Sequence, residues 1–168
     1  MMETNLTKHI ANQGLGISGL GGWLILVQIG IFLTLIMTIV NVFVNILPVY
    51  EHETWTALIS SESVVYHEMW APVVIFETVY NIALIAYVIY LITQFYGKKR
   101  TVPALMILLY VGGFVVGLID YILLQQIPFA REMEGESTLK ALFRSFLACC
   151  IWVPYFIRSR RVKNTFVR

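Results

Sequence analysis

The chain has 168 residues, of which 58% are hydrophobic and 13% are charged. Soluble globular domains carry about 25% charged residues, so this composition excludes an ordinary soluble domain and indicates a protein embedded in a membrane. The formal net charge of +2 is too small to predict a nucleic-acid partner, and the excess of apolar residues excludes intrinsic disorder. The length is that of a single domain.

Four apolar stretches are long enough to cross a bilayer, because a hydrocarbon core of about 30 Å takes about 20 helical residues. Backbone groups must be hydrogen-bonded within lipid, so stretches of this length without alternation predict helices rather than barrel strands. We therefore expect an all-α, polytopic membrane protein that forms a four-transmembrane-helix bundle. Its single domain comprises spans at about 23–47, 72–96, 104–127 and 139–157, outer loops 48–71 and 128–138, an inner loop 97–103 and a basic tail 158–168.

The first apolar stretch has a competing interpretation as a cleavable signal peptide. Its length of about 25 residues exceeds the usual hydrophobic region of about 7 to 15 residues, and no small-x-small cleavage site precedes Pro48. We therefore expect it to be retained as a span.

The distribution of cations predicts that both termini face the cytoplasm, because short loops rich in Lys and Arg are retained on that side. The first outer loop contains neither Lys nor Arg, whereas most acidic residues fall in outer segments. With this orientation the outer side carries Arg131, Lys140 and Arg144. The inner side carries Lys8, Lys98, Lys99, Arg100, Arg158, Arg160, Arg161, Lys163 and Arg168.

Three charged residues lie at least four positions inside the ends of the predicted spans, where a charge costs about 2.5 to 3.5 kcal/mol and usually faces protein or water. Glu77, Asp120 and Arg144 each lie about 7 to 11 Å below the outer edge of their span. Asparagines of the first two spans reach the same depth, and a lysine lies one turn above Arg144. The predicted intramembrane polar cluster therefore consists of Asn41, Asn45, Glu77, Asn81, Asp120, Lys140 and Arg144.

Three interpretations of this cluster stay open. It could be structural, with Arg144 paired with Asp120 or Glu77 and the asparagines satisfying the remaining hydrogen bonds. It could instead bind or conduct a cation or a small polar solute, because two carboxylates against one guanidinium leave a negative charge unless Lys140 neutralises it. The third interpretation is that the long side chains extend to the membrane surface.

The third span contains the GxxxG motif Gly113 to Gly117, which lets helix backbones approach closely. The motif predicts helix packing, either inside one bundle or between copies of the chain. Asp120 lies on the same helical face as the two glycines.

The tail carries Arg158, Arg160, Arg161 and Lys163 and no acidic residue. Cations beside a span set its orientation, and each attracts anionic lipid headgroups with about 1 kcal/mol. We expect these four residues to contact headgroups at the cytoplasmic face.

No nucleophile elbow, phosphate-binding loop, dinucleotide fingerprint or catalytic-triad spacing is found, so no enzymatic activity is expected. Cys149 and Cys150 are adjacent in the fourth span, where they are expected to pack rather than to form a disulfide or hold a metal. No cofactor and no metal site is predicted.

Two segments carry a resemblance to a known family. The N-terminal motif is Gly21-Gly22-Trp23-Leu24, and the C-terminal motif is IWVPYFIRSRRVKNTF at residues 151–166. Over about residues 14–166 the chain resembles a family of small bacterial integral membrane proteins catalogued only as a domain of unknown function. The resemblance implies a four-span, multi-pass protein of the bacterial cytoplasmic (inner) membrane, with no established substrate or catalytic residues.

Three classes of function stay open. The leading hypothesis is a non-enzymatic structural or accessory component that contacts lipid and assembles with itself or with other membrane proteins. The alternative is transport of a small solute, ion or proton through the polar cluster, and a membrane-embedded enzyme is a lesser alternative. A water-filled cavity at the cluster would favour transport, whereas a dry, packed cluster would favour the structural role.

Overall fold

The computed structural model describes residues 18–168, apart from the side chains of residues 134 and 135. Throughout these residues the regular elements are helices. Four helical segments are long and apolar enough to cross a membrane, namely Trp23–Tyr50, Trp70–Tyr96, Val102–Leu124 and Glu136–Arg158. The predicted all-α, four-span architecture is therefore confirmed. Lys8, which the orientation argument includes, lies outside the described residues.

The first span changes its helix type near its end. Helix α2 (Trp23–Asn41) continues into a π-helical turn, η1 (Val42–Ile46), and a 3-10 turn, η2 (Leu47–Tyr50). Pro48 lies in the first turn of η2. Because proline lacks a backbone N–H and its ring clashes with the preceding turn, the regular α-helical hydrogen bonds cannot continue through it. The short helix α3 (His52–Ile59) follows.

The remaining helices are α4 (Trp70–Tyr96), α5 (Val102–Leu124), α6 (Pro128–Arg158) and α7 (Arg160–Thr165). The main difference from the predicted boundaries is that α6 includes residues 128–138, which we expected to form an outer loop. Pro128 lies in the first turn of the helix, where a missing N–H costs nothing, and helix-forming residues follow it. Hydropathy marks where a helix leaves the apolar core, but the helix itself continues beyond that point.

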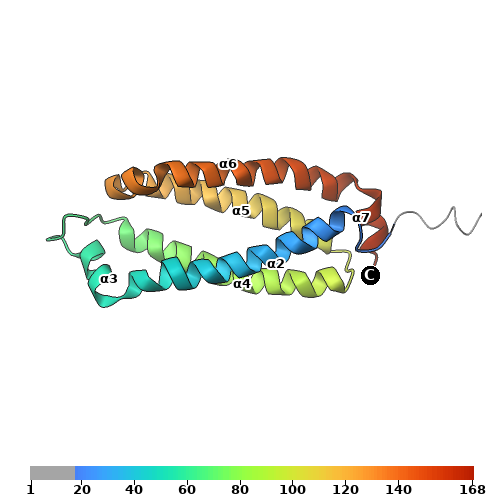
Figure 1. Cartoon of the computed structure of the whole chain (residues 1–168), viewed down its shortest axis with the longest axis horizontal. Helices are drawn as coiled ribbons and strands as arrows, with labels where there is room; N and C mark the ends of the chain where they lie inside the picture. The colour runs from blue at the N-terminus through green and yellow to red at the C-terminus, as the bar shows by residue number, and fades with distance from the viewer. Residues whose placement is uncertain (1–17) are drawn as a thin grey trace, which may run out of the picture.

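The helices form two antiparallel pairs, as Figure 1 shows: α5 with α6, and α2 with α4. Helix α4 also packs against α5 and so joins the pairs. Helix α3 lies at one end of the bundle and α7 at the other (Figure 1), and these are called the α3 end and the α7 end below.

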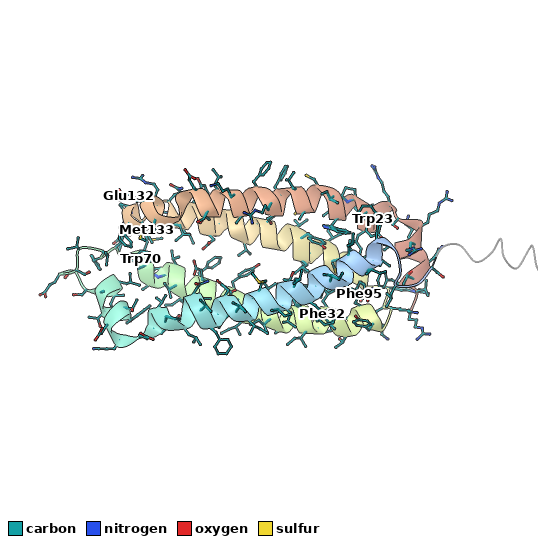
Figure 2. The ribbon with its side chains drawn as sticks, viewed as in Figure 1. Trp23, Phe32, Trp70, Phe95, Glu132 and Met133 are labelled. Atoms are coloured by element: carbon teal, nitrogen blue, oxygen red, sulfur yellow. The ribbon has the colours of Figure 1, made fainter. Side chains whose placement is uncertain are left out.

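The main hydrophobic core occupies the α7 end of the bundle. It is built from α2, α4, α5 and the C-terminal segment, and includes Leu24, Val27, Ile31, Val88, Leu91, Phe95, Val102, Met106, Phe156, Val162 and Phe166. Figure 2 labels Trp23 and Phe95 toward this end, and Trp70 and Met133 at the α3 end. Many apolar side chains on the outside of the spans are exposed, including Leu33, Ile36, Val79 and Ile82. A bilayer covers such surfaces, so they are lipid-facing helix faces.

The N-terminal and C-terminal motifs contact each other at the α7 end. The rings of Trp23 and Trp152 lie edge to face with centroids 6.3 Å apart. The Gly19 N–H donates to Thr165 Oγ1 at 2.9 Å, and the Thr165 hydroxyl donates to the Gly19 carbonyl oxygen at 3.3 Å. The tail is thus folded against the start of α2.

The same tail also pairs with the loop between α4 and α5. The Arg100 N–H donates to the Arg168 carbonyl oxygen at 2.7 Å, and the Arg168 N–H donates to the Lys98 carbonyl oxygen at 3.1 Å. Because Phe166 is buried in the core, these bonds hold a packed segment in place. The tail therefore closes the α7 end of the bundle.

Candidate functional site

A cavity of about 740 Å³ lies at the α3 end of the bundle. We call it the polar chamber, because its wall carries the side chains of Asn41, Asn45, Glu77, Tyr80, Asn81 and Asp120. Its volume lies within the range of about 300–1,000 Å³ that is typical of small-molecule sites. Trp70 and Met133, both labelled in Figure 2, also line it.

Helical spacing explains why these residues share one wall. Residues three or four positions apart lie on one face of a helix. On α4 this rule brings Glu77, Tyr80 and Asn81 together, and on α5 it joins Gly113, Gly117 and Asp120, all of which line the chamber. The predicted residues of the first three spans therefore meet around one space.

The asparagines form a continuous series of hydrogen bonds. The Asn45 amide donates to Asn41 Oδ1 at 2.7 Å, and the Asn41 amide donates to Asn81 Oδ1 at 3.3 Å. The Asn81 amide donates in turn to the Glu77 carbonyl oxygen at 2.8 Å. Because Asn81 is 9% exposed, burial and hydrogen bonding together fix its orientation. The series links the first span to α4 along the chamber wall.

The chamber contains two acidic side chains that come from different helices. Glu77 on α4 and Asp120 on α5 are both half-buried and line the same space. Lysine and arginine are missing from the described residues of the wall. The wall of the chamber is therefore acidic within the described residues.

Helix α6 contributes different residues from those predicted. Its polar contribution to the wall consists of Ser137 and Thr138, whereas Arg144 and Lys140 are missing from the described lining. Arg144 is exposed. Its pairing with Asp120 or Glu77 stays a prediction.

The register of α6 on α5 explains this difference. The ring centroids of Phe114 and Phe146 lie 5.7 Å apart, and the Cys149 thiol donates to the Tyr110 carbonyl oxygen at 3.1 Å. This register puts Arg144 level with residues 115 and 116, about 7 Å from Asp120 toward the α7 end. If α6 entered the membrane at residue 139, as the hydropathy predicts, Arg144 would instead lie at the depth of Asp120.

Lys140 lies closer to the level of Asp120 but has another partner. Its Nζ atom is 3.0 Å from Glu136 Oε2, and the two side chains are 64% and 91% exposed. Such an exposed pair contributes little to stability. The role of Lys140 as a neutralising charge for the chamber stays a prediction.

The two glycines of the GxxxG motif face different helices. A Cβ atom built at Gly113 would lie 3.8 Å from the Tyr80 hydroxyl oxygen on α4, and one at Gly117 would lie 3.8 Å from Leu142 Cδ1 on α6. The motif thus lies between α5 and both of its neighbours in the bundle.

Three of the four predicted headgroup contacts, Arg158, Arg160 and Lys163, are exposed at the α7 end. Arg161 is half-buried, and its guanidinium lies beside the backbone of Gly22, where an added Cβ would be 2.5 Å from Nη1. Arg161 is therefore partly a packing residue of the motif junction.

Sequence reasoning missed several lining residues, namely Tyr80, Ser137, Thr138 and Trp70. Tyr80 could have been found, because it follows Glu77 by three positions. Ser137 and Thr138 were assigned to an outer loop. Among residues 18–168, no group of three or more His, Cys, Asp or Glu side chains is placed to hold a metal ion.

Comparison with known proteins places the chain in a family. A family described as "Protein of unknown function (DUF2569)" matches residues 17–167. The chain is also similar to the inner membrane protein YdgK of Escherichia coli (strain K12), with 28% identity over 149 residues that cover 88% of this chain and 93% of that protein. No solved structure matches the chain. With four apolar helices and a family match over most of its length, the chain is a membrane protein that belongs to the DUF2569 family of unknown function.

Proposed function

We propose that this protein is a non-enzymatic membrane component that binds a small organic cation in the polar chamber. The observation that carries the proposal is the wall itself: Glu77 and Asp120 face a cavity of about 740 Å³ together with three asparagines. A carboxylate within a membrane-spanning helix is costly, and a bound cation offsets that cost. The asparagine oxygens offer additional acceptors to an ammonium group.

The proposed orientation puts the chamber on the outer side of a bacterial cytoplasmic membrane, with both termini in the cytoplasm. The basic residues of the α4–α5 loop and of the tail meet at the α7 end, and the positive-inside rule assigns that end to the cytoplasm. The similarity to an inner membrane protein supports the choice of membrane. The chamber then receives its ligand from the periplasmic side or from the outer leaflet.

Binding fits the packing better than continuous permeation does. Between the chamber and the α7 end lies the main core, in which Leu24, Val88, Leu91 and Met106 are fully buried. A solute could cross only if these side chains separated, because protein interiors leave few voids. The exposed apolar faces of the spans leave room for a second copy or another membrane protein to pack against the bundle while the chamber holds its ligand.

The test is calorimetric titration of the protein in nanodiscs with n-butylamine at neutral pH. We expect saturable binding that weakens at least tenfold in Glu77→Gln and in Asp120→Asn. The matched control is Glu62→Gln, an exposed acid in the loop before α4, which should bind as the unmodified protein does. Equal binding by the double variant Glu77→Gln/Asp120→Asn would refute the proposal.

A second measurement separates binding from transport. In liposomes, n-butylamine uptake should equal that of protein-free vesicles when measured at pH 6, where the amine is charged. Uptake that saturates and disappears in Glu77→Gln would overturn the binding role in favour of transport.

A further inference from the structure

A second cavity, of about 280 Å³, adjoins the polar chamber between α4 and α5. We call it the apolar groove, because the described side chains along it come from residues 80–87 of α4 and 108–116 of α5 and are almost all apolar. Its one phenol toward the α7 end, Tyr87, donates its hydroxyl hydrogen to the Leu105 carbonyl oxygen at 2.6 Å. The polar tip of that side chain is therefore satisfied, and the groove surface stays apolar.

Three residues belong to the walls of both cavities: Tyr80, Gly113 and Val116. The polar chamber and the apolar groove therefore meet at these residues. Gly113 has no side chain, and a Cβ atom added there would lie 3.8 Å from the Tyr80 hydroxyl oxygen. The boundary between the two spaces is thus formed in part by the glycine backbone on α5 and by a tyrosine on α4.

We propose that the two spaces form one site for a single-chain amphiphile with a cationic amine headgroup. The inference rests on the proposed function, since the ammonium group would occupy the polar chamber beside Glu77 and Asp120. The aliphatic chain would lie in the apolar groove, which follows α4 from Tyr80 to Tyr87, a distance of about 10 Å along the helix.

Charge selects the headgroup. An anionic headgroup, such as a phosphate or a fatty-acid carboxylate, would meet two carboxylates and no cation in the described wall, so it is repelled. A neutral alcohol could accept and donate hydrogen bonds, but it carries no charge and so lacks the attraction to the two acidic side chains that an ammonium group has. An amine satisfies both requirements, because an ammonium group carries three donors and a positive charge.

The position of the groove, rather than its apolar surface, favours a ligand with an aliphatic chain. The groove is apolar, and so is the lipid outside the bundle, so a chain gains little hydrophobic free energy by leaving the bilayer for the groove. Recognition therefore depends on the position of the groove directly beside the chamber. A ligand that reaches the chamber from the membrane can insert its headgroup while its chain stays in apolar surroundings.

The test uses photolabelling in nanodiscs made from a zwitterionic lipid. The probe is tetradecylamine with a diazirine in the middle of its chain, and tetradecanol with the same diazirine serves as the uncharged comparison. We expect the amine to label peptides of α4 and α5 that border the groove at least fivefold more than the alcohol does. Equal labelling by both probes, or labelling spread evenly over all four spans, would overturn the inference.

Variants test the chamber and the junction separately. Gly113→Leu should reduce groove labelling at least fivefold by filling the junction, whereas Gly30→Leu is the matched control, because a Cβ at Gly30 meets no atom within 4 Å. Glu77→Gln/Asp120→Asn should lower labelling by the amine to the level of the alcohol. If Gly113→Leu fails to fold, Gly113→Ala takes its place, with an expected reduction of about twofold; unchanged labelling there would also overturn the inference.

The n-butylamine titration distinguishes the two proposals. Butylamine has a headgroup but almost no chain. Gly112→Leu adds a side chain to the apolar groove at a residue that does not line the chamber, so this variant should bind butylamine as the unmodified protein does while losing the tetradecylamine label. Binding of butylamine together with equal labelling by amine and alcohol refutes the amphiphile and leaves the proposed function standing. If the protein neither binds butylamine nor is labelled preferentially by the amine, both the proposed function and the amphiphile site are refuted.

Discussion

Replacing Gly22 with alanine is expected to loosen the junction between the N-terminal and C-terminal motifs. Gly22 has φ 60° and ψ −134°, a conformation that residues with a side chain rarely adopt. An alanine Cβ would also lie 2.5 Å from Nη1 of Arg161, so the guanidinium must move. The substitution therefore combines backbone strain with the displacement of one side chain.

The expected size of the effect follows from these two terms. Backbone strain at such a position costs about 1–3 kcal/mol, whereas the end of an arginine side chain moves at little cost. The matched control is Gly30→Ala in the middle of α2, where an added Cβ meets nothing within 4 Å. Alanine is favoured over glycine in a helix interior by about 1 kcal/mol, so the two variants should differ by about 2–4 kcal/mol.

The assay is unfolding of the detergent-solubilised protein by increasing SDS, followed by circular dichroism. Arg161→Ala combined with Gly22→Ala should recover only the small steric part of the loss, because the strained backbone remains. Equal stability of Gly22→Ala and Gly30→Ala would refute the reasoning. So would full recovery in the double variant, since it would assign the whole effect to the Arg161 contact.

Two further predictions concern the core and the chamber wall. Phe95→Ala removes a side chain that is 1% exposed and should destabilise the protein by about 3–5 kcal/mol in the same unfolding assay; Phe32→Ala, at 43% exposed, should cost far less, and equal losses would contradict the assignment of the core. Asn41→Ala and Asn81→Ala should show a coupling of about 0.6–2 kcal/mol in a double-mutant cycle, because they break one hydrogen bond, and strictly additive losses would contradict that contact.

The spans could be predicted because membrane insertion depends on local composition. Each stretch of about 20 apolar residues is recognised independently of its neighbours, and all four predicted stretches are helical. The start of α6 was misplaced because hydropathy reports contact with lipid, whereas the helix continues from Pro128 through a polar segment. Composition alone does not separate a polar helix from a polar loop.

The candidate site was partly predictable for the same local reason. Depth within a span and position on a helical face can both be counted along the chain, so Asn41, Asn45, Glu77, Asn81 and Asp120 were expected in one layer, and they line one chamber. The proposed roles of these residues rest on that arrangement and on the experiments above. Counting along the chain gave no indication of the apolar groove, whose walls come from two helices.

The amino-acid sequence by itself determined the four helices and the polar faces of the first three, because these properties depend on neighbours within a few turns. Tertiary packing alone decided the register of α6 on α5, which separates Arg144 from Asp120, and the contact between the two motifs at the α7 end. Register depends on how side chains of different helices interdigitate. The two cavities have the same origin, because a cavity exists only where separate helices fail to fill the volume between them.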